Sequence, residues 1–521
     1  MTIATTLSRL TGFVRQWAIA LALGTTAAAS AYNTANNVPN MIFELVAGGI
    51  LSSLFIPTFM DVRKRRGDEA AWRFAGNLMA LCALALGAVA LLGTLLPEPI
   101  MWTQYFLRGS SGSSAEVREL ANFFFRFFAI QVAFYGVGMI VQALLNAQRK
   151  FLWPALGPVF NNLVVIAFML VAVVLPLNKN TYTLIALGTS LGVLIMFVVM
   201  LPSLRKTGFR LYLGINLRDP DLRAMLKLAL PMLFYVACNL VAVSVRNAAA
   251  ATTGTAGQAI VAYANIWSNL PYGIIAVSVA TAVFTELSHA ATSEDLSSFK
   301  ISFVSGLRTT GLLILPASAL LWGLSHPLIS LYVGGRMSAS DALPIVSVLQ
   351  AWAIPLVFYA GMMYVLRAFY SLRDTLTPAI ANFFCTFLQI GGYLLLTGSV
   401  LSVPVLGVVG IPISDAIFDF TLLIALLILL RRKIGSFNLR QSLLAFAKMA
   451  LVSIVVGALC WFGSNALTGI LGSGRVSSLL VVFILGCAGL ALTVLAAHVL
   501  GIEEITSFAA KMKRRFVRKA A

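Results

Sequence analysis

Two arginines interrupt an otherwise apolar segment near the start of the chain, in SRLTGFVRQWAIALALG (residues 8–24). Arg9 and Arg15 have no acidic residue three or four positions away, and Arg246 stands alone in the same way in VAVSVRNAAAATTG. A guanidinium group binds a phosphate through paired hydrogen bonds, so these arginines suit an anion such as a phosphate or diphosphate. Since Arg at the centre of a membrane helix costs at least about 2.5 kcal/mol, the three side chains should face a wet cavity or an anionic partner.

The positions of Arg9 and Arg15 on one helix limit how they could share a ligand. Six residues separate them, so on an ideal helix the side chains lie about 120° apart around the axis and about 9 Å apart along it. Gly12 lies between them and would allow a bend that brings the two groups closer. Gly12 is therefore a candidate gating position.

The alternative role for the arginines is structural pairing with acids inside apolar segments, which are Glu44, Glu286, Asp415 and Asp419. Asp415 and Asp419 are four positions apart in GIPISDAIFDF, on one face of a helix. A carboxylate pair of this kind suits binding Na⁺ or relaying H⁺, and two uncoupled acids that cap a helix or line a pore would give the same pattern. Asp415 and Asp419 are candidate ion-coupling residues.

The elements that must position these side chains are membrane helices. Hydrophobic residues make up 60% of 521 positions and charged residues 11%, so no ordinary soluble domain could cover this surface with polar groups. The apolar runs are about 20 residues or longer and lack the alternation of a transmembrane β-barrel. We predict an all-α integral membrane protein with fourteen transmembrane helices, at residues 3–25, 32–60, 72–96, 120–147, 153–176, 181–202, 222–251, 257–288, 299–325, 341–370, 376–399, 405–430, 441–466 and 476–500.

The net charge of +19 follows the positive-inside pattern and does not indicate a nucleic-acid partner. When the loops are assigned alternately to two sides, most Lys and Arg residues fall on one side, which predicts that both termini face the cytoplasm. The start of the chain lacks the features of a cleaved signal peptide. Five cysteines inside apolar segments and three scattered histidines predict neither a disulfide framework nor a metal site.

Two short motifs recur with the spacing of a six-helix repeat. An Asn-x-Pro element ends at Pro39 and again at Pro271, and a basic residue stands five positions before a proline at Arg149 and at Arg373. A true duplication would give two lobes in the same orientation, with a ligand site between them; chance similarity is the alternative. Pro39 and Pro271 would each kink a helix, so they are candidate gating positions, and purely structural kinks are an equal alternative.

The predicted organisation therefore has two lobes and an appendage. Its parts are an N-lobe at residues 1–203, a cytoplasmic linker at 204–221, a C-lobe at 222–431, two extra helices at 432–500 and a basic tail at 501–521. The linker and the tail are expected to meet anionic lipid headgroups rather than a specific partner, each basic residue contributing about 1 kcal/mol.

An ordered series of motifs resembles one known family. SRLTGFVRQ, NNVPNMIFELVAGGILSSLFIP, LLNAQRKFLWPALGPVFNN, LPYGIIAVSVATAVFTELS and RAFYSLRDTLTPA are similar to the MurJ (MviN) lipid II flippases of the multidrug/oligosaccharidyl-lipid/polysaccharide exporter superfamily. This resemblance covers the first eleven predicted helices, and fourteen helices matches the family's architecture. It implies export of the undecaprenyl-diphosphate-linked peptidoglycan precursor across the bacterial cytoplasmic membrane, by alternating access around a cationic cavity.

The resemblance also implies roles for particular residues. Arg9 and Arg15 occupy the positions of functionally important arginines in the family's first helix, and Arg246 is expected to be a cavity arginine of the second lobe. The last two helices would form a groove for the polyprenyl tail. The chain departs from many members at Gln16, where they have an acid, and at Phe43, where they have arginine. It departs from some members at Ile266, where they have arginine, so its cavity should be less basic than in those members.

Three alternatives to this function differ in what the sequence should contain. A flippase for another polyprenyl-diphosphate glycan, of the capsule or O-antigen type, has the same physical requirements. A drug/cation antiporter would want an acidic cavity and only twelve helices. An enzyme would need paired carboxylates in an extramembrane loop, and the scattered loop acids do not predict one. We expect no cofactor beyond coupling to Na⁺, H⁺ or the membrane potential, and the cell-division or cell-wall synthesis machinery as candidate partners.

Overall fold

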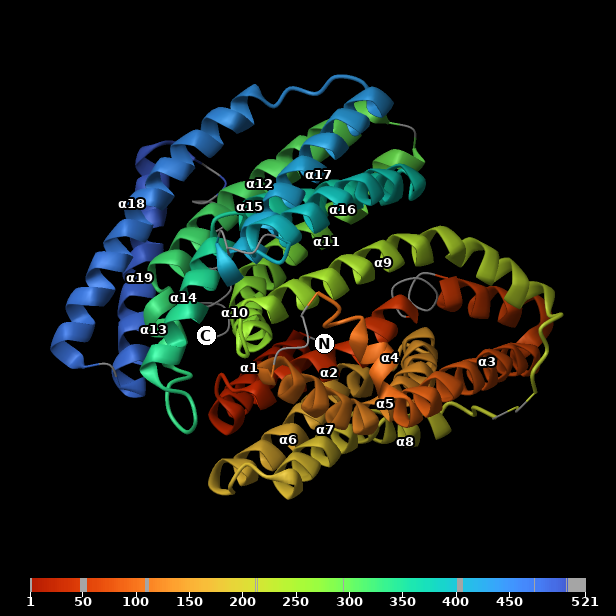
Figure 1. Cartoon of the computed structure of the whole chain (residues 1–521). Helices are drawn as coiled ribbons and strands as arrows, with labels where there is room; N and C mark the ends of the chain where they lie inside the picture. The colour runs from red at the N-terminus through yellow and green to blue at the C-terminus, as the bar shows by residue number, and fades with distance from the viewer. Residues whose placement is uncertain are drawn as a thin grey trace, which may run out of the picture. The chain divides into compact units, whose positions relative to one another are not determined.

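The computed structural model describes residues 2–46, 54–107, 112–210, 212, 214–293, 295–400, 406–472, 474–502 and 504. These residues form helices joined by short turns, and the described part of the chain contains no named β-strand (Figure 1). The first helices are α1 (Thr2–Leu23), α2 (Ala27–Val46), α3 (Ile56–Leu95), α4 (Pro97–Trp102), α5 (Gly112–Ala147), α6 (Leu152–Val174), α7 (Lys179–Val198) and α8 (Leu201–Arg205). The others are α9 (Pro220–Thr252), α10 (Gly257–Pro271), α11 (Val277–Thr292), α12 (Leu296–Gly323), α13 (Ser325–Ser330), α14 (Ala339–Ala353), α15 (Leu356–Ser371), α16 (Leu376–Leu396), α17 (Gly410–Ile434), α18 (Arg440–Leu471) and α19 (Arg475–Val499).

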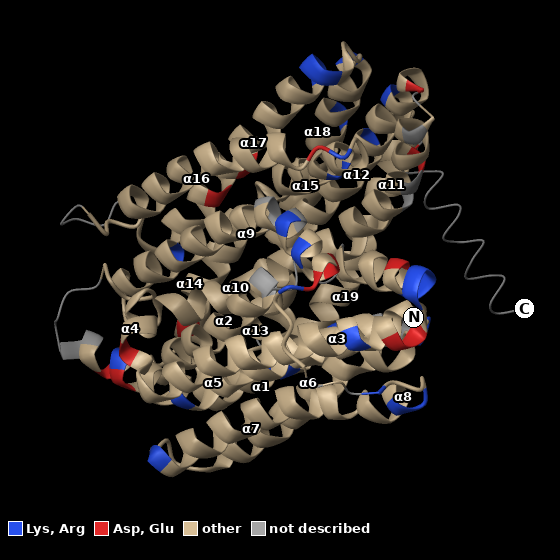
Figure 2. Cartoon of the chain, turned by 90° about the vertical axis from the view of Figure 1, so that its right-hand side faces the viewer, with Lys and Arg blue, Asp and Glu red and all other residues tan. Residues whose placement is uncertain are grey.

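The predicted membrane segments correspond to helices along the whole chain. Each of the fourteen predicted segments overlaps one of these helices or a pair of consecutive ones. Eleven spans in the described residues are long and apolar enough to cross a membrane, or twelve if the bent pair α14 and α15 is one span. The all-helical membrane class is confirmed, whereas the count of fourteen and the repeat stay predictions. Figure 2 shows the corresponding pattern of long uncharged stretches, with charged residues mostly at or near helix ends.

The chain divides into two compact units by its contacts. Unit 1 contains residues 1–259 and Gly334–Met337, and unit 2 contains the rest. The predicted lobes are defined by a sequence repeat rather than by compactness, so their boundaries stay a prediction. In unit 1, α1 packs along α6, and α5 packs along both α2 and α3.

The predicted membrane segments 32–60 and 72–96 leave a loop at residues 61–71, within the basic stretch DVRKRRGDEAAWR, and this expectation of a loop is wrong. Helix α3 runs through it, interrupted only by a kink at Gly67, where φ is 85°. Ion pairs one turn apart stabilise the helical turns on either side of the kink: Arg65 with Asp61 at 2.7 Å and Arg73 with Glu69 at 2.7 Å. Charge alone therefore did not mark a break in the helix here.

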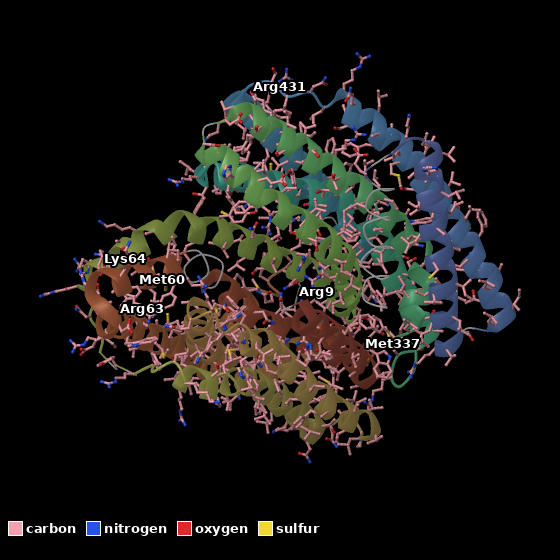
Figure 3. The ribbon with its side chains drawn as sticks, turned by 180° about the vertical axis from the view of Figure 1, so that it is seen from behind. Arg9, Met60, Arg63, Lys64, Met337 and Arg431 are labelled. Atoms are coloured by element: carbon pink, nitrogen blue, oxygen red, sulfur yellow. The ribbon has the colours of Figure 1, made fainter. Side chains whose placement is uncertain are left out.

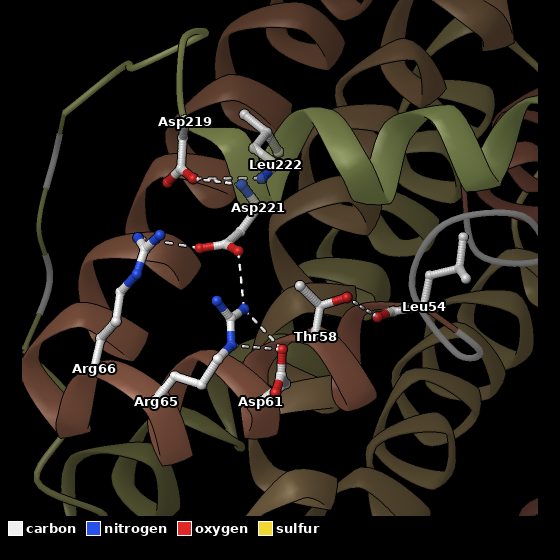
Figure 4. A network of polar contacts seen from close by, with 8 residues as sticks. All are labelled: Leu54, Thr58, Asp61, Arg65, Arg66, Asp219, Asp221 and Leu222. Carbon is white, nitrogen blue, oxygen red and sulfur yellow. Dashed lines mark hydrogen bonds and ion pairs between the residues drawn. The ribbon is translucent and has the colours of Figure 1, made fainter.

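The linker that precedes α9 is fastened to α3. Figure 4 shows Arg65 and Arg66 of α3 converging on Asp221 in the first turn of α9, at 3.0 and 3.1 Å. Asp219 caps α9 by accepting from the backbone N–H of Asp221 at 2.9 Å. These contacts give the linker a specific protein surface in addition to the lipid headgroups expected from the sequence.

Further contacts hold the linker along the next turns of α3. Asn77 donates to the carbonyl of Asn216 at 2.9 Å, and its own side-chain oxygen accepts from the Asn216 N–H at 2.7 Å. A Cβ added at Gly76 would lie 2.3 Å from the carbonyl oxygen of Tyr212. The linker backbone therefore passes so close to α3 that only glycine fits at residue 76.

We predict that Gly76→Ala lowers the free energy of unfolding by about 1–3 kcal/mol, because the new methyl group must displace the linker backbone. The measurement is the unfolding midpoint of the purified protein in detergent. Gly87→Ala in the same helix is the matched control, since a Cβ there meets nothing within 4 Å. A midpoint for Gly76→Ala equal to that of Gly87→Ala would contradict the close contact.

Unit 2 has a helical core with the two C-terminal helices packed on its flank. Helix α12 packs along α18, α16 along α17, and α18 along α19. The pair α18 and α19 corresponds to the predicted extra helices at residues 432–500 and is drawn in blue in Figure 1. Arg308 on α12 forms an ion pair with Glu504 at 2.7 Å, which ties the segment after α19 to α12.

The two arginine–proline motifs fold in the same way. Arg149 and Arg373 have φ of 56° and 57° and are the non-glycine residues with positive φ among those described. Each follows a helix, and the next N–H donates to a carbonyl five residues back, from Lys150 to Leu145 and from Asp374 to Phe369. This shared and unfavourable conformation supports the repeat at the level of local structure.

Candidate functional site

Arg15 is a half-buried cation on α1 without a charged partner in the described residues. Its Nε atom is buried and has no hydrogen-bond partner there, and the ion pairs of the described residues do not include it. An arginine in this state retains donors for an anionic ligand.

Arg246 on α9 has the same properties as Arg15. It is half-buried, its Nε atom is buried, and that atom has no hydrogen-bond partner among the residues described. The fold places Arg246 in unit 1 together with Arg9 and Arg15. The unpartnered state of Arg246 is the property expected from its lone position in the sequence.

The two arginines lie at similar distances from the carboxyl ends of their helices. Arg15 is eight residues before the end of α1 and Arg246 is six before the end of α9, which is about 12 Å and about 9 Å at 1.5 Å per residue. The backbone N–H of Ala259 in the first turn of α10 donates to Ser30 Oγ in the first turn of α2 at 3.3 Å. Since α2 follows α1 and α10 follows α9, this contact brings the ends of α1 and α9 to one end of unit 1.

A buried amide cluster fixes the turn of α9 that carries Arg246. Asn247 donates to Gln104 Oε1 at 2.8 Å, Gln104 donates to Ser244 Oγ at 3.0 Å, and Gln258 donates to the Asn247 carbonyl at 2.9 Å. Gln104, Asn247 and Gln258 are all buried. Sequence analysis missed this cluster, because its members come from three separate segments and no spacing links them.

Arg9 is exposed one and a half turns before Arg15. Figure 3 shows it on α1, apart from Arg63 and Lys64 at the edge of the molecule. Helix α1 is continuous through Gly12, and Asn162 of α6 donates to Thr11 Oγ1 at 3.0 Å. Both the bend at Gly12 and its gating role stay predictions.

The two prolines that were predicted to kink helices both lie within helices. Pro39 is buried within α2. Pro271 ends α10 and is followed at once by the π-helical turn Tyr272–Ala276 and then by α11. Insertion of a π-turn after a proline is a recognised source of helix bending, and the gating role of both prolines stays a prediction.

A second polar site in unit 2 surrounds Asp415. Its oxygen atoms accept from Trp352 Nε1 at 2.9 Å and from Gln389 Nε2 at 2.9 Å, and the Tyr393 hydroxyl also donates to it. Asp419, one turn along α17, is buried. The donors come from α14 and α16, so the structure places the predicted acidic pair at a junction of three helices.

Comparison with known proteins decides the family. The profile of the family described as "Lipid II flippase MurJ" matches residues 19–502. This chain belongs to that family. Among curated MurJ proteins, the lipid II flippase of Burkholderia cenocepacia is 26% identical over 79% of this chain and 78% of its own length. The probable lipid II flippase of Vibrio cholerae is 25% identical over 92% of this chain and 94% of its own.

Solved structures agree at the level of fold. A MurJ lipid II flippase in an inward closed conformation has a TM-score of 0.77 and 23% identity, over 96% of this chain and 99% of its own. An inward-facing multidrug resistance MATE family transporter of the MOP superfamily has a TM-score of 0.69 and 16% identity, over 82% and 94%. This chain therefore shares the fold of both structures.

The residues at which this chain departs from the expected family pattern are buried or partly buried. Phe43 packs against Tyr135 with ring centroids 4.7 Å apart. Gln16 is buried and Ile266 is partly buried. At position 43, where the resemblance led us to expect an arginine in many members, this chain forms an aromatic contact.

The other charged residues inside the predicted membrane segments add no buried charge to the candidate site among the described side chains. Lys227, Arg126 and Lys448 are exposed, as expected of side chains that extend toward a helix end. Glu286 is exposed, and the Glu44 side chain lies outside the described part of the structure. Among the described residues no group of three or more His, Cys, Asp or Glu could hold a metal ion.

Proposed function

We propose that this protein transports lipid II, the undecaprenyl-diphosphate-linked peptidoglycan precursor, across the bacterial cytoplasmic membrane. Membership of the MurJ family supports this substrate. The observation that carries the mechanism is the half-buried, unpartnered guanidinium group of Arg15. A half-buried cation without a counter-ion carries a cost in desolvation free energy, and binding of an anionic substrate reduces that cost.

In the proposed mechanism the diphosphate binds Arg15 first, with Arg9 and Arg246 as further donors. Arg9 is exposed and would meet the headgroup on entering, whereas Arg15 and Arg246 are half-buried. The lobes would then change their mutual angle so that the site opens to the other side. No covalent step is required, so the protein acts as a transporter and not as an enzyme.

We further propose that Asp415 and Asp419 couple transport to an ion gradient, and that the ion is H⁺ rather than Na⁺. The atoms that Trp352 and Gln389 direct at Asp415 are N–H donors. These donors stabilise a carboxylate, but they cannot act as ligands of a cation, which binds oxygen atoms. Asp419 would then be the group that takes up and releases the proton.

The proposed orientation has both termini in the cytoplasm, according to the positive-inside rule. Helices α18 and α19 would hold the polyprenyl tail, since many of their apolar side chains are exposed. Exposed examples on these two helices are Leu451, Ile454, Phe462, Phe483 and Leu495.

A flippase for another polyprenyl-diphosphate glycan is the second candidate, because the same arginines would bind its diphosphate. Expression in two depletion strains separates the candidates. We expect growth to be restored in cells depleted of their lipid II flippase and not in cells that lack an O-antigen flippase. Rescue of only the second strain, at normal membrane levels of the protein, would contradict the proposal.

A further inference from the structure

We propose that a pocket between α4 and α5 binds the headgroup of a zwitterionic phospholipid that carries a primary ammonium group, of the ethanolamine type. The pocket has a volume of about 280 Å³ and lies entirely in unit 1. Its polar lining residues are Glu98, Arg118, Glu119 and Asn122. This binding site is separate from the proposed transport site and does not depend on the flippase function.

The pocket lies at the level of lipid headgroups. The second half of α3 exposes a run of large apolar side chains that ends at Leu96, with Leu92, Leu95 and Leu96 each more than half exposed. Such a surface belongs in the hydrocarbon layer. Glu98 follows two residues later and is exposed, so the boundary between hydrocarbon and headgroups passes through the pocket.

Aromatic residues at the end of α4 and just after it support the position of the pocket at the level of the lipid headgroups. Trp102 lines the pocket with 60% of its surface exposed, and its ring lies 5.7 Å from that of Phe106. Trp residues are enriched where a membrane meets water, since the ring is apolar and the N–H group is polar. Met101 and Tyr105 are buried and form the floor of the pocket.

The charges of the pocket match a headgroup that has both signs. Figure 2 shows acidic and basic segments side by side next to α4. Arg118 is half-buried and Glu98 and Glu119 are exposed, and no ion pair within the described residues includes any of the three. Arg118 suits the phosphate and the two carboxylates suit an ammonium group.

A pocket with one arginine and two carboxylates distinguishes between the headgroups of common phospholipids. A glycerol headgroup has the phosphate for Arg118 but no cation for Glu98 and Glu119. A choline headgroup has a cation without N–H donors, so it cannot form charge-assisted hydrogen bonds with carboxylates. Only a primary ammonium group supplies both the positive charge and the donors.

The test is native mass spectrometry of the full-length protein with equal amounts of phosphatidylethanolamine, phosphatidylcholine and phosphatidylglycerol that have identical acyl chains. We expect phosphatidylethanolamine to be retained about three- to tenfold more than the others, a moderate factor because the carboxylates are exposed. The double variant Glu98→Gln/Glu119→Gln should lose this preference, and Arg118→Gln should weaken binding of all three lipids.

Glu116→Gln is the matched control, because Glu116 is exposed on the same helix and does not line the pocket. It should keep the preference of the parent protein. Equal retention of the three lipids by the parent would overturn the proposal, as would a double variant that behaves like Glu116→Gln. Unfolding midpoints equal to that of the parent would show that the variants remain folded.

Discussion

Replacement of Arg15 with alanine is expected to reduce lipid II export at least about 100-fold, because a guanidinium group forms two hydrogen bonds to a diphosphate at about 1.5–3 kcal/mol each. The protein should still insert, since Arg15 forms no ion pair with the described residues whose loss would leave an acid unpaired. The measurement is the rate at which lipid II becomes accessible outside cells depleted of their own flippase, at matched membrane levels of parent and variant.

Two further substitutions make this result specific. Arg15→Lys keeps the charge but loses the planar pair of donors, so its export rate should lie between those of the parent and Arg15→Ala. Arg126→Ala removes an exposed arginine from another membrane helix and should leave export unchanged. If Arg15→Ala exports lipid II at the rate of the parent, Arg15 is not a substrate-binding residue.

Replacement of Asp415 with alanine should destabilise the protein by about 1–3 kcal/mol, because it removes the shared acceptor of a half-buried network of hydrogen bonds. Three donors from Trp352, Gln389 and Tyr393 would then have no acceptor. Asp415→Asn keeps one acceptor oxygen and should cost less. The measurement is the unfolding midpoint of each purified variant, compared with Tyr393→Phe, which removes only one donor. An Asp415→Ala protein as stable as Tyr393→Phe would contradict the network.

The same acidic pair gives a test of ion coupling, in which the measured quantity is the dependence of export on the ion gradients. In the Asp415→Asn/Asp419→Asn double variant, we expect export to lose its dependence on the proton gradient, since no carboxyl group remains at this junction of helices. Export would be followed while the proton gradient and the sodium gradient are collapsed separately. An unchanged response to both treatments would remove Asp415 and Asp419 from the coupling mechanism.

The sequence predicts the structure correctly where hydrophobicity alone determines the outcome. Apolar runs longer than about 20 residues must be helices in a membrane, because lipid offers no partner for backbone N–H and C=O groups. Arg15 and Arg246 were identifiable for a related reason: a charge inside such a run has few acceptable surroundings. The structure leaves both buried Nε atoms without a hydrogen-bond partner among the described residues.

Sequence reasoning failed where the outcome depends on tertiary neighbours. The kinked but continuous α3 was missed because its charged turn resembles a loop until Asp61 and Glu69 are paired with Arg65 and Arg73. The partners of Asp415 lie on two other helices, more than 20 residues away in the sequence. No local spacing predicts such contacts, so the acidic pair was identified but its surrounding donors were not.

The arginine–proline motifs could be found in the sequence, but their backbone conformation could not be predicted from it. The similarity of the two arginine–proline motifs was noted in the sequence, yet only the structure reveals that Arg149 and Arg373 both adopt positive φ. A non-glycine residue in this region costs about 1–2 kcal/mol. No propensity rule would place arginine there.

The central claim, that this protein exports lipid II, is tested most directly by the appearance of lipid II in the outer leaflet of cells whose own flippase has been depleted. The lipid would be measured by its cleavage with an externally added enzyme that cannot cross the membrane. Our account predicts that expression of this protein restores cleavage to the level of undepleted cells. If lipid II stays protected while the protein is present at normal levels in the membrane, lipid II is not its substrate.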